Sequence, residues 1–326
     1  ALLVTLSLVG TAVAAPPPAP SPSHVVVEHF ASKALGVDKH VVVYLPRGYD
    51  SQPRTRWPVF YYLHGLGGDE TNWTAGMHLD QAADKLGLAA IIVMPDGDDG
   101  FYFNSATPID YDQCMKDGTG LFSVKEPHDT TCVRQRSYGS YIAEDLVQWV
   151  DKTYRTIAKR EGRGIAGLSM GGFGAIDHAL RDHAFAAAAS HSGAIELRYI
   201  GPHPYVAGQA PRMLTEPSKY NSAGQVGAWI AKMFGQDIAT WKAHDIVGLL
   251  DTNAAAFKDL ALYFDCGSED DFQLDDNLKF VHEQLTAHKI AHEFFIGPGH
   301  HNAAFWTARA PFSLQFLRDH VAKPTN

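Results

Sequence analysis

Eight short runs of apolar, β-branched or aromatic residues recur along the chain from about residue 24. Most of them are apolar at nearly every position, which is typical of strands buried on both faces of a parallel sheet. The first two have no helical pattern between them, so we expect an antiparallel pair at one edge. The expected strands are His24–Phe30, His40–Leu45, Pro58–Leu63, Ala89–Met94, Gly164–Leu168, Ala186–Ser190, Leu260–Phe264 and Glu293–Ile296.

Helical patterns lie between several of these runs. Apolar residues spaced by three, four and seven positions share one face of a helix. Strands that alternate with such helices predict an α/β fold with a mostly parallel sheet and helices on both faces. One such set is Ile142, Leu146, Trp149 and Val150, and another is Leu274, Leu278, Val281 and Leu285.

Two segments, 100–137 and 199–232, lack any clear periodicity. Long irregular insertions in a compact domain usually cover a functional site or are disordered. Cys114 and Cys132 both lie in the first segment, and we expect them to form a disulfide if the chain is exported. Cys266 follows an apolar strand and is expected to be a buried, inert thiol.

The first residues read as a targeting segment rather than as part of the fold. Residues 1–14 are uncharged and apolar but shorter than the roughly 20 residues that span a bilayer. Small residues at alternating positions and the prolines that follow suit signal peptidase cleavage. We therefore expect a partial signal peptide over 1–15, a Pro-rich linker over 16–23, one catalytic domain over 24–326, and a secreted or periplasmic location.

The composition and charge of the chain limit the classes of molecule that it can bind. The 326 residues carry 27 Lys and Arg against 36 Asp and Glu, a net charge of −9, and 45% are hydrophobic. Such a globular, acidic chain lacks the basic surface that nucleic acid or an anionic membrane requires. No membrane span is expected in the domain, and the oligomeric state is left open. A small-molecule or polysaccharide-linked substrate remains.

A nucleophile motif supplies the first chemical signal. Gly167-Leu168-Ser169-Met170-Gly171 fits G-x-S-x-G, with an expected strand before it and a helix after it. That context describes the strained strand-to-helix turn on which an α/β-hydrolase exposes its serine. The backbone N–H of Met170 is one candidate oxyanion donor, and that of Leu66, in the Gly-rich turn after an earlier strand, is the second. His64 is expected to orient this turn.

The serine needs an imidazole base and a carboxylate to orient the imidazole, in the chain order Ser, Asp or Glu, His. The strand ending at Phe264 leads into four carboxylates, of which Asp270 is the first candidate, with Asp271 and then Glu269 as alternatives. The last strand leads into two adjacent histidines, of which His301 is preferred over His300. No zinc-binding pattern is present, and a serine triad needs no cofactor, so neither a metal nor a cofactor is expected.

These motifs together resemble the esterase family of the α/β-hydrolase superfamily that includes esterase D-type enzymes, feruloyl esterases and the antigen 85 mycolyltransferases. The resemblance implies the α/β-hydrolase fold and selects Ser169, Asp270 and His301 as the triad, because Trp306 follows His301 by five positions and Asp270 follows Gly267 by three. It also places the oxyanion donors at Leu66 and Met170. The matching segments, in order, are 64–68 with Trp73, 94–97, 141–146, 167–172, 234–235 with Trp241 and 244–245, 265–270, and 298–301 with Trp306.

The chain departs from that family in two places near the site. Segment 100–137 is a long insertion, and Ala303 stands where a tryptophan often follows the histidine. Trp73, Phe101 and Tyr102 are candidates for lining the substrate pocket, although core packing suits them equally.

We expect a secreted serine esterase that hydrolyses carboxylic esters through an acyl-enzyme intermediate. An acyltransferase with the same triad, as in the mycolyltransferases, is the alternative. A non-catalytic binding protein ranks below both, because each triad position has a candidate in the expected order.

Overall fold

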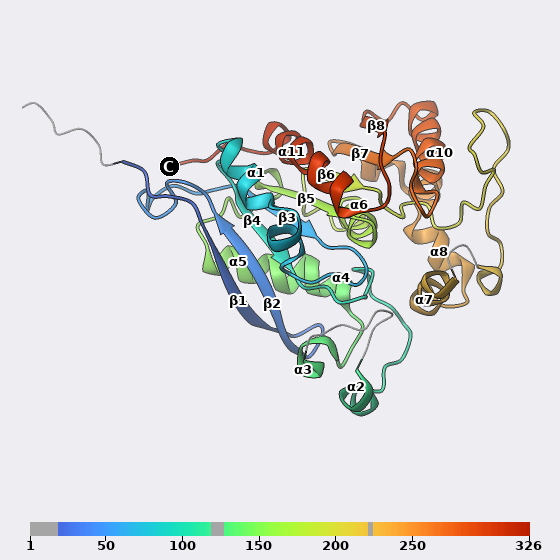
Figure 1. Cartoon of the computed structure of the whole chain (residues 1–326), viewed down its shortest axis with the longest axis horizontal. Helices are drawn as coiled ribbons and strands as arrows, with labels where there is room; N and C mark the ends of the chain where they lie inside the picture. The colour runs from blue at the N-terminus through green and yellow to red at the C-terminus, as the bar shows by residue number, and fades with distance from the viewer. Residues whose placement is uncertain (1–18, 119–126, 221–223) are drawn as a thin grey trace, which may run out of the picture.

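The eight apolar runs form one mixed sheet in the computed structural model, which describes residues 19–118, 127–220 and 224–326 (Figure 1). The expected signal segment, 1–15, lies outside the described residues. The strands are β1 (His24–Ser32), β2 (Val37–Leu45), β3 (Val59–Leu63), β4 (Ile91–Pro95), β5 (Arg163–Leu168), β6 (Ala187–His191), β7 (Ala261–Gly267) and β8 (Glu293–Gly297).

The strand order is β1-β2-β4-β3-β5-β6-β7-β8. β1 pairs with β2 and β2 with β4 in antiparallel orientation, and every later pairing is parallel. This confirms the predicted antiparallel edge and the mostly parallel sheet. The central strands β3, β4 and β5 are buried at every position, as their continuous apolar runs predicted.

Helices cover both faces of this sheet. Two helices, α1 (Leu79–Lys85) and α11 (Ala303–His320), pack together on one face, against the side chains of Phe60, Tyr62 and Ala166. The opposite face carries the helices whose periodicity was visible in the sequence. They are the π-helical turn η2 (Tyr141–Leu146) that continues into α5 (Val147–Thr153), then α6 (Met170–Arg181) and α10 (Leu274–Ala287).

The remaining helices belong to the two irregular segments and to the connection before β7. The first segment contains the short helices α2 (Tyr111–Asp117) and α3 (His128–Thr131), and α4 (Tyr138–Ser140) follows it. The second contains α7 (Gly224–Phe234), followed by α8 (Ile238–His244) and α9 (Ile246–Asn253). No helix among the described residues combines the length and the apolar composition needed to cross a bilayer.

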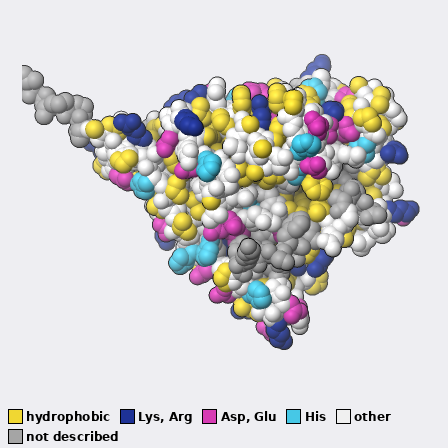
Figure 2. Space-filling view, viewed as in Figure 1, with side chains coloured by type: hydrophobic (Ala, Val, Ile, Leu, Met, Phe, Trp, Pro, Cys, Tyr) yellow, Lys and Arg dark blue, Asp and Glu magenta, His cyan; other side chains and the backbone are white. Residues whose placement is uncertain are grey.

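Charged side chains of both signs are mixed on the face of the molecule shown in Figure 2. On this face, acidic and basic groups are interspersed with apolar and neutral ones rather than gathered by sign. The parallel strands β3, β5, β6, β7 and β8 all end at one edge of the sheet, where the loops after them meet. In open α/β sheets this edge is where ligands bind, and the candidate site lies there.

Candidate active site

Ser169 occupies a sharp turn between the end of β5 at Leu168 and the start of α6 at Met170. Its backbone has φ 52° and ψ −115°, a conformation that a residue with a side chain rarely adopts. The Ser169 N–H donates to the carbonyl of His191 at 2.8 Å, which holds the turn against β6. The strained turn lifts the hydroxyl above the sheet edge, at the positive end of the α6 dipole.

The flanking glycines of the motif are sterically required. A Cβ on Gly167 would lie 2.2 Å from the carbonyl oxygen of Gly171, and a Cβ on Gly171 would lie 2.3 Å from that of Leu63. Contacts this short with backbone atoms are not relieved by side-chain movement. The two glycines therefore let the start of α6 approach β3 and β5 closely enough to form the turn.

Three of the predicted residues form one hydrogen-bonded array. His301 Nε2 lies 2.9 Å from Ser169 Oγ, and His301 Nδ1 lies 2.8 Å from Asp270 Oδ2. Because the carboxylate accepts from Nδ1–H, Nε2 carries the lone pair and can accept the serine proton. The loops after β7 and β8 supply the acid and the base, so each comes from a separate strand end.

The alternative acids and base lie outside this array. His300 is exposed, with Glu269 and Asp271 as its nearest carboxylates at 3.6 and 3.7 Å. Asp271 accepts the backbone N–H of His301 at 3.1 Å and so holds the loop rather than the imidazole ring. The structure therefore brings Asp270 and His301 to Ser169 and leaves the other candidates at the surface.

Asp270 is held as a carboxylate by several donors. Its Oδ1 accepts the backbone N–H groups of Phe272 at 3.0 Å and Leu274 at 3.4 Å. Its Oδ2 accepts from His301 and also from the Cys266 thiol at 3.4 Å. Burial alone raises the pKa of Asp270, but the hydrogen bonds from His301, Phe272 and Cys266 outweigh it and hold the pKa below its usual value.

Two aromatic rings fix the orientation of the imidazole. Phe272 and Trp306 both meet His301 edge-on, at ring-centroid distances of 4.8 and 5.0 Å and interplanar angles of 81° and 89°. Perpendicular contacts of this kind restrict rotation of the His301 ring. The histidine side chain is only 7% exposed, and it lines the cavity together with Ser169.

The second expected oxyanion donor, Leu66, lies in a turn that His64 organises. The Gly97 N–H donates to His64 Nε2 at 2.8 Å, so the hydrogen on this neutral ring sits on Nδ1 and is donated to the carbonyl of Gly65. Gly67 N–H donates to Asp99 Oδ1 at 2.8 Å, which anchors the other side of the turn. His64 is fully committed to the loop, as the sequence indicated, and does not contact Ser169.

A cavity of about 610 Å³ opens directly onto Ser169 and His301. Leu66 and Met170 both line it, and Met170 begins α6, where the first N–H groups have no partner within the helix. The remaining wall is mostly apolar and comes from the inserted segment, the residues between β6 and α7, α7 itself, the acid loop and the start of α11. These residues include Phe101, Leu197, Tyr199, Ile200, Tyr220, Val226, Ile230, Phe272, Leu274 and Trp306.

Only one of the three expected pocket residues lines this cavity. Phe101 does, whereas Trp73 and Tyr102 are core residues. The Trp73 indole donates to the carbonyl of Leu63 at 3.0 Å, beneath the cavity. The Tyr102 hydroxyl donates to the carbonyl of His64 at 3.1 Å and its ring packs against Gly174. Both aromatic side chains therefore support the oxyanion turn from behind.

Sequence reasoning missed the contribution of α7. Val226 and Ile230 are four positions apart and share the face that lines the cavity. That spacing is present in the sequence, but residues 199–232 as a whole lack a clear periodicity and so predict no helix. Phe272, two residues after Asp270, was also missed. Its proximity in sequence to the acid was the only signal for it.

The inserted segment 100–137 reaches the cavity through Phe101, and this segment together with the preceding Asp99 also contacts α7. Trp229 Nε1 donates to the carbonyl of Asp99 at 2.9 Å. The Ser105 and Thr107 hydroxyls, both 2.6 Å away, donate to the carbonyls of Met233 and Lys232 at the end of that helix. The insertion therefore positions one wall of the cavity from behind.

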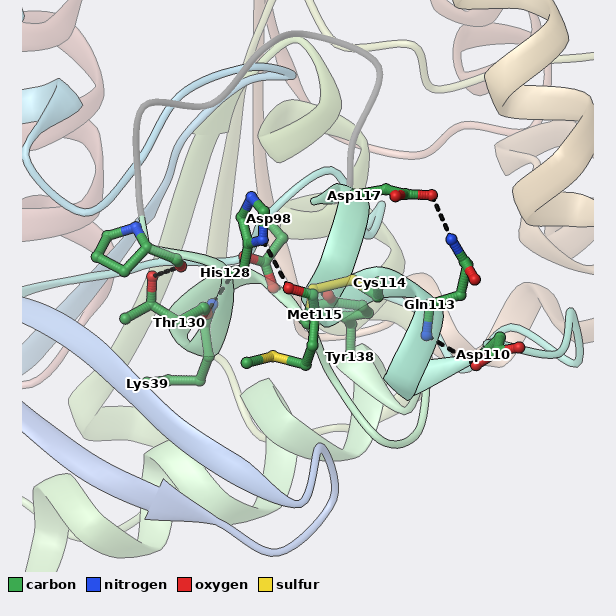
Figure 3. The surroundings of a disulfide bond; sticks show 12 residues. Lys39, Asp98, Asp110, Gln113, Cys114, Met115, Asp117, His128, Thr130 and Tyr138 are labelled. Atoms are coloured by element: carbon green, nitrogen blue, oxygen red, sulfur yellow. Dashed lines mark hydrogen bonds and ion pairs between the residues drawn. A yellow bond between two sulfur atoms is a disulfide. The ribbon is translucent and has the colours of Figure 1, made fainter.

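The predicted disulfide between Cys114 and Cys132 joins α2 to α3 within this insertion (Figure 3). α3 packs beside β2, where the buried Lys39 ammonium donates to the carbonyl of Thr130 and to Asp98 Oδ1, both at 2.8 Å, and also to Asp96. The covalent link thus fixes the insertion next to a buried ion cluster beneath the 96–99 turn. No group of three or more His, Cys, Asp or Glu suited to a metal ion occurs among the described residues.

Comparison with known proteins agrees with this geometry. The family model described as "Putative esterase" matches residues 32–322. Esterase Rv1288 of Mycobacterium tuberculosis is 33% identical over 171 residues, which are 52% of this chain and 32% of that protein. The endo-1,4-beta-xylanase/feruloyl esterase of Xylanibacter ruminicola is 31% identical over 152 residues, 44% of this chain and 18% of that protein. The chain thus spans a third or less of the length of these two relatives.

A solved ferulic acid esterase superposes on the chain with a TM-score of 0.66 and 21% identity, covering 92% of this chain and 99% of that one. At this level of identity the superposition shows the fold, which is the α/β-hydrolase fold that the motifs implied. The family match extends over nearly all of the described domain and includes every strand end that carries the array. The chain therefore belongs to the esterase family of α/β-hydrolases, a family of serine hydrolases.

Proposed function

We propose that this protein is a serine carboxylesterase that works through an acyl-enzyme intermediate. The observation that carries this proposal is the continuous array from Asp270 through His301 to Ser169, which opens into the cavity. His301 would take the serine proton as the oxygen attacks the ester carbonyl, and the N–H groups of Leu66 and Met170 would stabilise the resulting oxyanion. His301 would then protonate the leaving alcohol, and water would release the acid.

The cavity favours a neutral ester with an apolar or aromatic part. The one lysine among its described lining residues, Lys219, is exposed and pairs with Glu216 at 2.7 Å. Glu196, also in the wall, is buried, and burial together with the nearby Asp245 raises its pKa well above the usual value, so it is expected to be neutral. A substrate with a carboxylate or phosphate would find no unpaired cation here.

Aromatic esters such as ferulates are the first candidates for the substrate. Phe101, Tyr199 and Phe272 offer ring contacts within a volume that suits a small organic ligand. The names of two relatives, a feruloyl esterase and a ferulic acid esterase, support the same class. Whether water or another hydroxyl accepts the acyl group is decided by adding a competing alcohol to the assay and measuring the transfer product.

Export from the cytoplasm is the second part of the proposal. The uncharged apolar stretch 1–14, with its small residues and following prolines, supports it at the level of sequence. The disulfide between Cys114 and Cys132 supports it at the level of structure, because disulfides persist in oxidising compartments. Fractionation of a culture that expresses the full-length gene would test it, and purely cytoplasmic protein would refute it.

The central test measures hydrolysis of p-nitrophenyl butyrate and methyl ferulate by the wild-type protein and by Ser169→Ala. The proposal predicts turnover by the wild type, covalent labelling by a fluorophosphonate, and loss of both in the variant. A fall of at least 1,000-fold in kcat is the order expected when a triad nucleophile is removed. A Ser169→Ala protein that hydrolyses these esters at the wild-type rate would refute the assignment.

A further inference from the structure

A chain of three hydrogen bonds links Trp306, in the wall of the cavity, to the proposed acid Asp270. The Cys266 thiol on β7 lies 3.4 Å from Asp270 Oδ2, the oxygen that also accepts from His301 Nδ1. Cys266 is fully buried and Asp270 is 6% exposed. A hydrogen bond in so little water is electrostatically stronger than the same bond at the surface.

The thiol in turn contacts Ser192, and Ser192 contacts Trp306. The Ser192 side chain hydrogen-bonds to Cys266, and the Trp306 indole N–H donates to Ser192 Oγ at 3.2 Å. Ser192 follows β6 and has a φ of 45°, a conformation that is costly for serine and is retained where the surroundings demand it. Three side chains from three separate elements thus form one line of contacts, and its last member, Cys266, meets the Asp270 carboxylate.

All three hydrogen bonds in this series can be donated in the same direction, toward Asp270. An indole N–H only donates, so Ser192 accepts from Trp306 and is free to donate its own hydrogen to sulfur. Burial raises the pKa of the Cys266 thiol well above its usual value, so the sulfur keeps its hydrogen and can donate it to Asp270. The direction of donation therefore runs from Trp306 through Ser192 and Cys266 to the carboxylate.

We propose that Cys266 is a positioning residue for the esterase reaction, and that with Ser192 and Trp306 it fixes Asp270 Oδ2 and moderates its charge. This inference rests on the proposed function of the Ser169–His301–Asp270 array. The thiol shares the oxygen that His301 uses, so it competes for the same negative charge. The thiol also helps to hold Oδ2 in the position where it faces the imidazole, while the backbone N–H groups of Phe272 and Leu274 hold Oδ1.

The consequence is a specific change in the pH dependence of activity. Without the thiol donor, Asp270 Oδ2 carries more negative charge. This charge stabilises the protonated, imidazolium form of His301. The acid limb of the pH profile of kcat/KM, where His301 gains a proton, should then move to higher pH. Other ionisable groups near this corner are Asp271, at the His301 backbone, and Asp275, whose charge acts on Cys266, and no variant below alters them.

The experiment compares the pH profiles of kcat/KM for p-nitrophenyl butyrate in the wild type, Cys266→Ala and Cys266→Ser. Cys266→Ala should move the acid limb upward by a few tenths of a pH unit and lower the plateau roughly fivefold. Cys266→Ser keeps a hydroxyl donor and should return the acid limb to the wild-type position. Ser192→Ala should shift it in the same direction as Cys266→Ala, and the two changes together should be less than additive.

Ser313→Ala is the matched control, because it also removes buried hydrogen bonds near β6 and β7, those of the Ser313 hydroxyl with His191, Tyr62 and the Ala310 carbonyl, but does not touch Asp270. It should leave the acid limb unchanged. An acid limb that Cys266→Ala leaves in place, with only the plateau lowered, would overturn the inference. If Cys266→Ala does not fold, the positions of the acid limb in Cys266→Ser and Ser192→Ala decide the question, since an unshifted Ser192→Ala would overturn it equally.

Failure of the proposed function would look different. In that case the wild-type protein would neither hydrolyse the ester nor be labelled by a fluorophosphonate. An active wild type whose acid limb is insensitive to Cys266 and Ser192 would remove only the positioning role.

Discussion

His191 Nε2 lies 2.8 Å from Ser313 Oγ, and Nδ1 of the same ring lies 2.8 Å from Asp265 Oδ1. The molecule thus contains a second Ser–His–Asp arrangement with distances close to those of the Ser169 array. All three side chains are fully buried, and Asp265 also accepts from Tyr263 and Arg309. No substrate reaches Ser313, so the same three residue types serve only to tie β6, β7 and α11 together.

The two arrays should therefore separate cleanly in a labelling experiment. Ser313→Ala should react with a fluorophosphonate probe like the wild type, while Ser169→Ala should not react. Ser313→Ala should also lower the free energy of unfolding by about 1–3 kcal/mol, because His191 loses a buried partner. Gel detection of the labelled serine and urea titration measure the two effects. Loss of labelling in a folded Ser313→Ala protein would contradict this interpretation.

A methyl group at Gly171 should disrupt the nucleophile turn. The added Cβ of Gly171→Ala would lie 2.3 Å from the carbonyl oxygen of Leu63, so α6 must move away from β3 and carry Ser169 with it. A displacement of about 1 Å at the reacting atom lowers enzyme activity by about 100-fold. Ester hydrolysis and thermal unfolding would measure the effect.

Gly76→Ala is the control for that substitution. Its Cβ would lie 3.7 Å from the nearest side-chain atom, in ordinary van der Waals contact. Near wild-type activity is expected for it. Equal activity in the two alanine variants would show that the close approach of α6 to β3 is not needed.

The sequence predicted the sheet well because burial on both faces leaves a continuous apolar signal. β3, β4 and β5 are buried at every position, and each was visible as such a run. The array was also predictable, because a triad on this fold must follow strand ends in a fixed order. The residues came from the ends of β5, β7 and β8, where the motifs placed them.

The pattern of apolar and polar residues does not predict the direction in which a loop side chain points. Trp73 and Phe101 are both buried aromatic residues in loops that follow strands, yet only Phe101 also lines the cavity. The difference arises from the tertiary position of the Leu63 carbonyl, which captures the Trp73 indole. The contact between Cys266 and Asp270 was hidden for the same reason. A cysteine after a strand gives no sign of which carboxylate its thiol will meet.

Lys39 should be essential for stability rather than chemistry. Burial lowers the pKa of this lysine, but the adjacent Asp96 and Asp98 outweigh burial and raise it, so the side chain stays charged. Lys39→Met would leave two buried carboxylates without their cation. We expect a loss of roughly 3–5 kcal/mol in the free energy of unfolding, measured by chemical denaturation.

Lys33→Met, at an exposed position directly after β1, serves as the control for Lys39→Met and should change stability by less than about 0.5 kcal/mol. If the two methionine variants were equally stable, the buried cluster would not contribute to folding.

The paired histidines between α10 and β8 should make stability depend on pH. His292 Nδ1 lies 2.8 Å from the carbonyl of Ile290 and donates to it, so its Nε2 accepts from His282 Nδ1 at 2.7 Å. Burial, and then His292, lower the pKa of His282. Below the unfolded value of about 6.5 the unfolded chain binds more protons, so the pair's contribution is complete above that pH and is lost as the pH falls.

His282→Gln should therefore weaken the fall in stability between pH 7 and pH 5. Urea midpoints measured across this range would show a shallower slope for the variant. His288→Gln is the control, since His288 is exposed and bonds only to the carbonyl of Gln284 among the contacts described. A steeper slope in His282→Gln than in the wild type would reverse the predicted sign.

Ile230 should control the size of the group that the esterase accepts. It lies on the face of α7 that lines the cavity, so Ile230→Trp would fill part of the space that the substrate is proposed to occupy. Bulky aromatic esters should lose at least tenfold in kcat/KM, because an overfilled pocket rejects a large group far more than a small one. Short acetate esters should be little affected.

Ala228→Trp, on the exposed face of the same helix, controls for changes in α7 itself and should keep the wild-type preference. The Ser105 and Thr107 hydroxyls hold the end of α7, so Ser105→Ala combined with Thr107→Val should loosen this helix. The double variant should then distinguish less between bulky aromatic esters and short acetate esters, which would link the insertion to substrate specificity. An Ile230→Trp enzyme that loses acetate and ferulate activity in equal proportion would show instead that α7 supports the array and not the substrate.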